Sequence, residues 1–248
     1  MTVKYETLAE MIEQRGTTSD DEICLTQAES GDSVTYNEFD QATDRVAKLL
    51  LDEDIGDGDP VAVLMKNTIE LVTAIGGVIK AGAVAVPVAP DYTEREIEYI
   101  LNQSNIGCVL TNEHDNETVA AALDSFAGLH VFTPTDYPGS GLEQPPEIQP
   151  TDTALLMYTS GTTGDPKAVD LSHYNLILRF DGGEMPAGQE VFYTLLPLYN
   201  IDGFATTFGT MYNGDQVLLR DGFSASSFWE DVDQYGANIT SVVPSILA

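Results

Sequence analysis

Short apolar runs alternate with stretches of helical periodicity along most of this chain, and this alternation limits the folds open to it. Short buried strands separated by helices of about ten residues are typical of parallel sheets covered on both faces. The sequence therefore predicts an α/β fold with doubly wound, mostly parallel sheets and right-handed crossovers. In the first half, the expected helices are 36–52, 68–81, 93–103 and 118–126, and the expected strands are 61–65, 83–88, 107–110 and 129–132.

The alternation breaks at 134–151, where PTDYPGSGLEQPPEIQPT contains five prolines and two glycines. Such a segment is typical of a loop or linker, and we expect it to join two sub-units, 1–133 and 152–248. In the second sub-unit we expect strands at 154–159, 168–171, 191–195, 216–219 and 239–243, and helices at 172–179, 203–212 and 226–235. A further helix is expected to start at Pro244, four residues before the chain stops.

Several classes of protein are disfavoured by the composition. Only two cysteines, Cys24 and Cys108, are present in 248 residues, which excludes a disulfide scaffold or a cysteine-rich zinc site. The three histidines are widely scattered and predict no metal site. The first residues, MTVKYETLAEMIEQR, lack the apolar run of a signal peptide. The longest apolar stretch, 71–90, is interrupted by Lys80, Gly82 and Pro87, so we expect a cytoplasmic protein without a membrane span.

The chain is strongly acidic, with 40 Asp and Glu residues against 10 Lys and Arg and a net charge of −30. Such a charge repels nucleic acids and anionic lipids, so neither is an expected partner. Clustered acids could instead mimic DNA or capture a basic protein. Dispersed acids could keep a protein hydrated in strong salt, where screening removes the self-repulsion. No run here exceeds three acids, and the pattern resembles that of halophilic proteins, from organisms that accumulate salt in their cytoplasm.

One segment has a composition suited to chemistry, Tyr-Thr-Ser-Gly-Thr-Thr-Gly-Asp-Pro-Lys at 158–167. Its glycines let the backbone turn sharply and bring N–H groups close to a ligand, and its hydroxyls add further donors. Lys167 adds a positive charge in a chain with only five lysines. Together these groups favour an anion with several oxygens, most simply a polyphosphate.

Two familiar phosphate loops do not match this segment. The pattern G-x-x-x-x-G-K-[ST], started at Gly161, fails at Pro166 and Ala168, and G-x-G-x-x-G is absent from the chain. A solvent-exposed loop with an ordinary turn at Asp165–Pro166 is the alternative. The segment nevertheless follows an apolar strand, at the carboxyl end where open α/β sheets bind ligands.

The segment YTSGTTGDPKAVDLSHYN (158–175) resembles the phosphate loop of the AMP-forming adenylate synthetases, which include acyl-CoA synthetases, luciferases and the adenylation domains of peptide synthetases. Three other segments resemble the same superfamily, in the same order, and the likeness covers essentially the whole chain. They are VTYNEFD (34–40), IKAGAVAVPVAP (79–90) and LPLYNIDGF (196–204).

The resemblance implies that a carboxylate attacks the α-phosphate of Mg-ATP to give an acyl-adenylate, and that a thiol, usually that of coenzyme A, then displaces AMP. It implies a fatty or other acyl substrate, and ATP, Mg²⁺ and coenzyme A as cofactors or co-substrates, but identifies no catalytic acid or base in this chain. The residues that it implies for the β- and γ-phosphates of ATP are Thr159, Ser160, Gly161, Thr162, Thr163, Gly164 and Lys167. Tyr199 and Asn200 are the weaker candidates for the acyl or thiol side.

Two residues depart from the usual pattern of the superfamily. Ala168 replaces a glycine after the loop, and Asn200 replaces a histidine in the LPLYN segment, which leaves the acyl preference and the thiol step open. Members of the superfamily are also roughly twice as long. We therefore expect an amino-terminal portion of a ligase, inactive alone, whose missing half lies further along the gene or on a second chain. An adenylation module that loads a carrier protein and a non-catalytic nucleotide-binding remnant are the alternatives.

Overall fold

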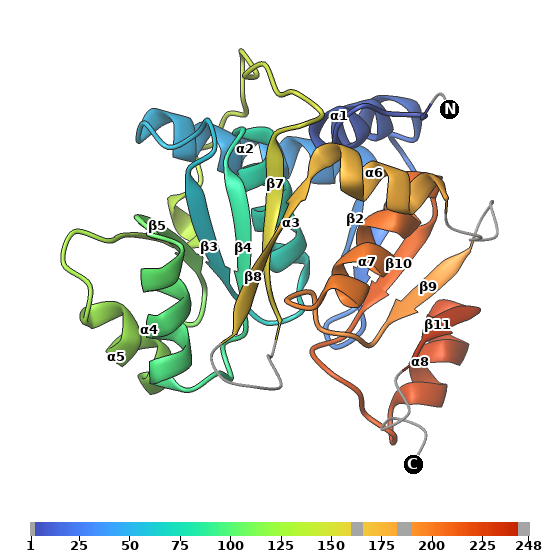
Figure 1. Ribbon diagram of the computed structural model, residues 1–248. Coiled ribbons are helices and arrows are strands. Elements are labelled where there is room, and N and C mark those ends of the chain that lie inside the picture. Colours follow the sequence, from blue (N-terminus) through green and yellow to red (C-terminus); the bar gives the residue numbers. More distant parts are fainter. Residues whose placement is uncertain (1–2, 160–165, 183–189, 243–248) are drawn as a thin grey trace.

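The computed structural model describes residues 3–159, 166–182 and 190–242, which form alternating layers of helices and sheets (Figure 1). The strands are β1 (Ile23–Gln27), β2 (Ser33–Thr35), β3 (Pro60–Leu64), β4 (Val84–Val88), β5 (Cys108–Thr111), β6 (His130–Phe132), β7 (Thr153–Thr159), β8 (Lys167–Ser172), β9 (Val191–Thr194), β10 (Gln216–Leu219) and β11 (Ile239–Ser241). The helices are α1 (Leu8–Thr18), α2 (Tyr36–Asp52), α3 (Ile69–Lys80), α4 (Glu94–Gln103), α5 (Glu117–Asp124), α6 (His173–Asp181), α7 (Ile201–Asn213) and α8 (Phe228–Tyr235), with a 3₁₀ turn at Pro134–Asp136.

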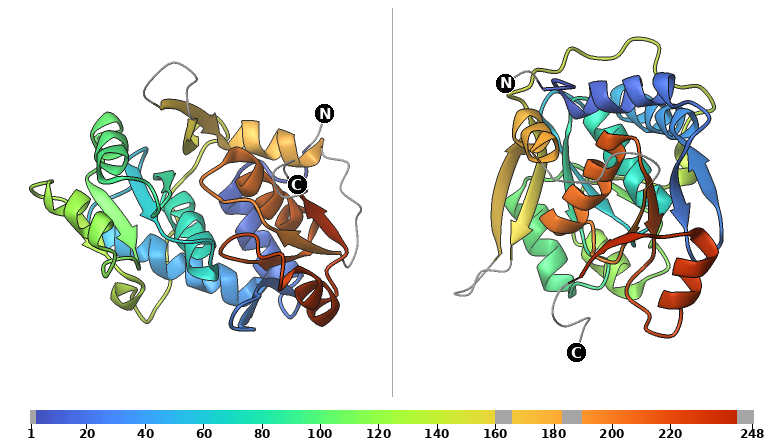
Figure 2. Two further views of the ribbon diagram at one scale, coloured as in Figure 1. Left: turned by 90° about the horizontal axis from the view of Figure 1, so that it is seen from below. Right: turned by 90° about the vertical axis from the view of Figure 1, so that its right-hand side faces the viewer.

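Two sheets are present among these residues, and both are mostly parallel. The first, called here the hairpin sheet, has the order β6-β5-β3-β4-β7-β8, and the second, the composite sheet, has the order β11-β9-β10-β1-β2. Only the edge strands β8 and β2 pair antiparallel to their neighbours. Helices lie on both faces of both sheets (Figure 2), so the expected doubly wound α/β architecture is confirmed.

The layers follow from the way the strands alternate their side chains. In β3, Val61 and Val63 join the large core between the two sheets, whereas Ala62 and Leu64 face α4 and α5 on the outer side. Successive strand residues point to opposite faces, so a strand buried on both faces is apolar throughout. The central layer contains α1, α2, α3, α6 and α7, and α8 covers the outer face of the composite sheet.

The central helices begin where their capping residues predict. The Thr35 hydroxyl accepts a hydrogen bond from the Glu38 N–H, and the Glu38 carboxylate accepts one from the Thr35 N–H, which completes the capping box of α2. Helix α3 is buried over most of its length, as a helix that is apolar all round should be. It packs closely on α2 because Gly77 has no side chain, and a Cβ there would collide with Val46.

The segment 134–151 is largely a loop, as expected, but it does not separate the two sheets. The strands β7 and β8, which follow it, extend the hairpin sheet, while β1 and β2, from the beginning of the chain, extend the composite sheet. Parallel strands need partners distant in sequence, and local patterning does not identify those partners. The division into sheet-forming sub-units 1–133 and 152–248 therefore does not hold for the strands described.

Three elements at the start of the chain, α1, β1 and β2, were not predicted from the sequence. Helix α1 has a weak apolar stripe, and its buried Arg15 and Gly16 do not fit an amphipathic pattern. The predicted elements from residue 36 to residue 241 all form, with ends that shift by a few residues. The helix expected from Pro244 lies outside the described residues.

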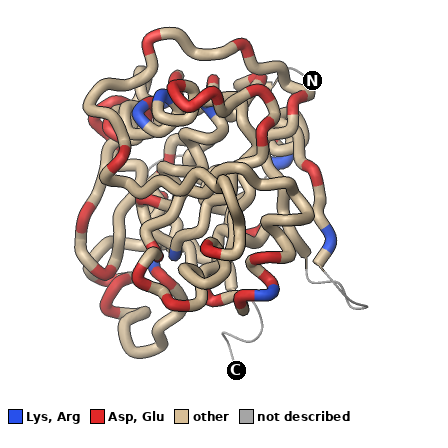
Figure 3. Tube along the Cα trace, turned by 90° about the vertical axis from the view of Figure 1, so that its left-hand side faces the viewer, with Lys and Arg blue, Asp and Glu red and all other residues tan. Residues whose placement is uncertain are grey.

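Acidic residues recur along the chain, and basic residues are sparse, on the side of the molecule that carries α4 and α5 (Figure 3). Among the described residues, no helix combines the length and apolar character needed to cross a membrane.

Candidate functional site at the carboxyl ends of the strands

The segment with the phosphate-loop composition connects the antiparallel strands β7 and β8. Thr159 ends β7 and pairs with Lys167, which begins β8. The Thr159 hydroxyl donates a hydrogen bond of 3.4 Å to the carbonyl of Lys167. Both side chains are exposed. A hydroxyl and an ammonium group thus flank the mouth of the loop, whereas Ser160, Gly161, Thr162, Thr163 and Gly164 lie outside the described residues.

Helix α4 and its C-cap residue, Ser104, contact this hairpin beside its loop through two hydrogen bonds. The Tyr99 hydroxyl donates to the carbonyl of Pro166 at 3.3 Å. The hydroxyls of Ser104 and Tyr158 lie 2.6 Å apart. Because Tyr158 also packs in the core beneath α4, the hairpin is anchored on the outer face of its sheet.

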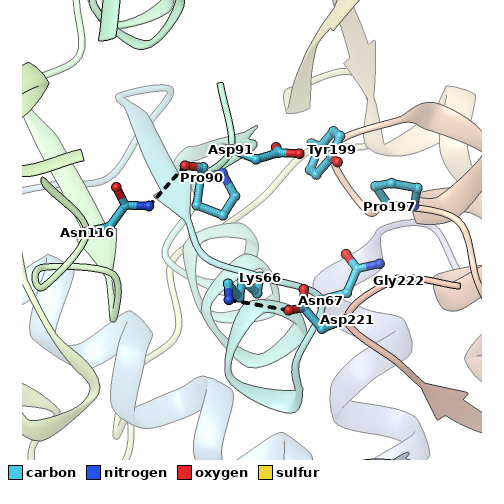
Figure 4. Close-up of a pocket in the computed structure, with 9 residues that line it drawn as sticks. All are labelled: Lys66, Asn67, Pro90, Asp91, Asn116, Pro197, Tyr199, Asp221 and Gly222. Atoms are coloured by element: carbon cyan, nitrogen blue, oxygen red, sulfur yellow. Dashed lines mark hydrogen bonds and ion pairs between the residues drawn. The ribbon is translucent and has the colours of Figure 1, made fainter. Parts of the chain in front are cut away.

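A cavity of about 320 Å³ lies where the carboxyl ends of strands from both sheets meet (Figure 4). Lys66 and Asn67 follow β3, and Asp221 follows β10 in the other sheet. Open α/β sheets bind their ligands at such an edge. The complete lining is Lys66, Asn67, Pro90, Asp91, Asn116, Pro197, Tyr199, Asp221 and Gly222.

Tyr199 lines this cavity and Asn200 does not. The Tyr199 ring lies 5.8 Å from the Tyr92 ring, centroid to centroid. Burial raises the pKa of Tyr199 to about 12, and the nearby Asp91 carboxylate contributes to the increase, so the phenol is protonated at neutral pH. Asn200 is exposed and occupies the N-cap position of α7, where its side chain makes no capping hydrogen bond.

The LPLYN segment folds tightly against the start of α7. The Asn200 N–H donates to the Pro197 carbonyl at 3.0 Å, and the Asn200 carbonyl accepts from the Phe204 N–H. Gly203 is required here because a Cβ would collide with the backbone of Pro197. The tight turn points Tyr199 toward the cavity, beside Asp91 in Figure 4.

An ion pair links the two sheets across the cavity. The Lys66 ammonium lies 3.5 Å from the Asp221 carboxylate, and both side chains are about half exposed. Burial raises the pKa of Asp221, and Lys66 opposes that rise. With Asp91 the cavity therefore carries two carboxylates and one ammonium group.

Sequence reasoning missed Lys66, Asn67, Asp91 and Asp221. Each one stands two or three residues beyond the end of a buried strand, so the general position of ligand sites in α/β sheets was the signal that could have found them. Which of the strand ends face one another depends on the strand order, which the sequence pattern does not contain.

No cluster of three or more His, Cys, Asp and Glu side chains suited to a metal ion occurs within the described ranges.

Comparison with known proteins decides the family. The family model for AMP-binding enzymes matches residues 12–248. The chain belongs to the AMP-binding enzyme family. The segments that resembled this superfamily in the sequence all lie within the matched region.

Relatives of this chain include CoA ligases and subunits of peptide synthases. The sulfoacetate–CoA ligase of Cupriavidus necator is 29% identical over 98% of this chain and 51% of its own length. Subunit 3 of the surfactin synthase of Bacillus subtilis is 32% identical over 77% of this chain and 15% of its own length. The chain thus spans about half of the CoA ligase and a small part of the synthase.

Solved structures agree on the fold. The o-succinylbenzoate CoA synthetase of Bacillus subtilis, in complex with its acyl-adenylate intermediate, superposes with a TM-score of 0.85 at 25% identity, over 96% of this chain and 62% of that one. The N-terminal domain of FACL13 from Mycobacterium tuberculosis gives a TM-score of 0.86 at 22% identity, over 97% of this chain and 64% of that one. The second likeness concerns the fold alone.

Proposed function

We propose that this chain is part of an ATP-dependent ligase that activates a carboxylic acid as its adenylate and transfers the acyl group to coenzyme A. The observation that carries the proposal is the β7–β8 hairpin, which has the phosphate-loop sequence between Thr159 and Lys167 and opens at the carboxyl edge of its sheet. Membership of the AMP-binding enzyme family supports the use of ATP.

The first step joins a carboxylate oxygen to the α-phosphorus of ATP and breaks the bond to the bridging oxygen, so that pyrophosphate leaves. An anion approaches a polyanion in this step, and donors and cations must offset the charge that develops. We assign Ser160, Gly161, Thr162, Thr163 and Gly164 to the β- and γ-phosphates, together with Thr159 and Lys167. The magnesium ion of Mg-ATP would offset further charge.

In the second step the sulfur of a thiol attacks the acyl carbon and AMP leaves, while the thiol loses its proton. We place the acyl or thiol side near Tyr199, because Tyr199 lines the cavity between the two sheets. The cavity contains two carboxylates and one ammonium group, so a short or polar acid suits it better than a long fatty chain does. The remaining machinery would come from a further part of the same protein or from a second chain.

A second candidate is an adenylation module that loads a carrier protein, and the likeness to the surfactin synthase subunit supports it. Both candidates share the adenylation step and differ in the thiol that receives the acyl group. Consumption of free coenzyme A supports the first candidate, and acylation of a carrier-bound phosphopantetheine supports the second.

The test is carboxylate-dependent exchange of pyrophosphate into ATP by the enzyme that contains this chain, with a panel of short, polar and long-chain acids. Lys167→Ala should reduce exchange by about 10- to 150-fold, because loss of one charge-assisted contact costs roughly 1.5–3 kcal/mol. Lys48→Ala is the matched control, since Lys48 pairs with Asp52 on the surface of α2. Nucleotide binding without exchange for any acid would favour a non-catalytic remnant. Equal exchange by both variants would show that Lys167 does not contact the phosphates.

A further inference from the structure

Asn67 lines the cavity, and its side chain is almost fully buried. It joins the carboxyl end of one sheet to that of the other. It follows β3 of the hairpin sheet and is 5% exposed. Its side-chain amide donates to the carbonyl of Leu196 at 3.2 Å, and its side-chain oxygen accepts from the N–H of Leu198 at 3.0 Å. Both partners belong to the segment that follows β9 of the composite sheet.

These two hydrogen bonds hold the backbone on either side of Pro197. An amide side chain can satisfy a carbonyl and an N–H at the same time because it carries both a donor and an acceptor. Asp cannot replace the donor, and Ala can replace neither group. The next residue after Leu198 is Tyr199, so the conformation that Asn67 holds determines where the Tyr199 ring enters the cavity.

The main chain of Asn67 is also held by the composite sheet. The Gln27 side-chain amide, from β1, donates to the Asn67 carbonyl at 3.4 Å. The Asn67 N–H faces the carboxylate of Asp221, which follows β10. The neighbouring Lys66 forms its ion pair with the same carboxylate. Contacts from β1 and from the segments that follow β9 and β10 therefore converge on Asn67, which follows a strand of the other sheet.

The two halves of the proposed site lie on different sheets. The phosphate-loop hairpin extends from the sheet of Asn67, whereas Tyr199 extends from the composite sheet. From this geometry we propose that Asn67 is a positioning residue, which fixes the acyl or thiol side of the site relative to the phosphate side. The catalytic consequence of this inference rests on the proposed function. The structural part, that Asn67 holds the segment after β9 in place, is independent of that function.

The structural part is tested on the chain itself by hydrogen exchange, read by mass spectrometry or NMR. Asn67→Ala should make the amides of residues 195–200 exchange about 10- to 100-fold faster than in the parent, because two buried hydrogen bonds are lost. Exchange in β4, within the hairpin sheet, should change much less. Asn213→Ala is the control, since the Asn213 amide donates to the Gly209 carbonyl within its own helix.

Asn67→Asp separates the two hydrogen bonds. A carboxylate still accepts from the Leu198 N–H, but it repels the Leu196 carbonyl, so the Leu198 amide should stay better protected than in Asn67→Ala. If Asn67→Ala does not fold, Gln27→Leu removes the bond to the Asn67 carbonyl, together with the bond from Gln27 to the Glu29 carboxylate, and should produce a smaller increase over the same residues. Uniform acceleration across both sheets, or none at 195–200, would overturn the positioning role.

The catalytic consequence is tested in the enzyme that contains the chain. Asn67→Ala should raise the KM for the carboxylic acid about tenfold while the KM for ATP changes by less than about twofold, because the misplaced group lies on the acyl side. Equal effects on both KM values would contradict the proposal. If the parent enzyme shows no pyrophosphate exchange, the proposed function fails, whereas the hydrogen-exchange result still decides whether Asn67 holds the segment.

Discussion

The hairpin sheet and the composite sheet carry the two sides of the proposed site, and they differ in how they are built and covered. The hairpin sheet is buried on its outer face by α4 and α5, and its central strands β3, β4 and β5 follow one another in the chain. The composite sheet combines strands from both ends of the described chain, and only α8 covers its outer face.

The cover of the composite sheet depends on a polar contact as well as on apolar packing. Arg220 donates two hydrogen bonds to Asp231 of α8, at 2.8 and 3.0 Å. The hydroxyl of Tyr193, from β9, also donates to the Asp231 carboxylate. Nearby, Trp229 is 71% exposed. Because less apolar surface is buried beneath its outer helix, we expect the composite sheet to open more easily than the hairpin sheet.

Of the changes proposed here, salt concentration should have the largest effect on the stability of the chain and on the difference in stability between its two sheets. A chain with a net charge of −30 repels itself at low ionic strength, and we propose that its acidic surface is adapted to strong salt. Melting temperature should rise by on the order of 10 °C between low and multimolar KCl, as about 4 kcal/mol of relieved repulsion would produce in a chain of this size. At low salt, hydrogen exchange should show that the composite sheet opens before the hairpin sheet. An unchanged melting temperature would refute the halophilic interpretation.

Breaking the Arg220–Asp231 pair should weaken the composite sheet selectively. Asp231→Ala leaves a largely buried guanidinium without its main partner, and such losses cost about 3–5 kcal/mol. Denaturant unfolding measures the loss, and hydrogen exchange should place it in β9 and β10. Asp233→Ala, at an exposed position two residues along the same helix, should change the unfolding free energy by less than about 0.5 kcal/mol. Equal losses in β3 and β5 would show that the sheets open together.

A smaller, pH-dependent effect is expected in the layer between the sheets. Burial lowers the pKa of His173 to about 4, and its neutral ring accepts a hydrogen bond from the Leu8 N–H at 3.2 Å, which joins α6 to α1. The unfolded chain binds this proton near pH 6.5, so the contribution is fully present above that pH and is lost as pH falls toward 4. The loss should reach about 3 kcal/mol.

The His173 effect is separated from the many carboxylates by comparison with His173→Asn. The stability difference between parent and variant, measured by urea unfolding in constant KCl, should change between pH 6.5 and pH 4. A difference that is independent of pH over this range would mean that His173 does not titrate on unfolding.

Local patterning by itself determined the α/β class, the capped helices α2 and α4, and the place of the phosphate-loop segment after an apolar strand. These features depend on neighbours within one or two turns, such as Thr35 with Glu38, so a single sequence contains them. The assignment of Thr159–Lys167 to the phosphates stays a prediction. Tyr199, from the LPLYN segment, lines the cavity, whereas Asn200 is not among its lining residues.

Only the tertiary structure decided which strands share a sheet and which strand ends share a cavity. β1 pairs with β10 across almost the whole chain, and Asn67 meets Leu196 and Leu198 although about 130 residues separate them. Parallel pairing and buried polar contacts of this kind join segments through three-dimensional packing, because each partner taken alone has no local preference for the other. For the same reason Asn67 looks like an ordinary loop residue in the sequence and becomes the junction between the two sheets only when the chain is folded.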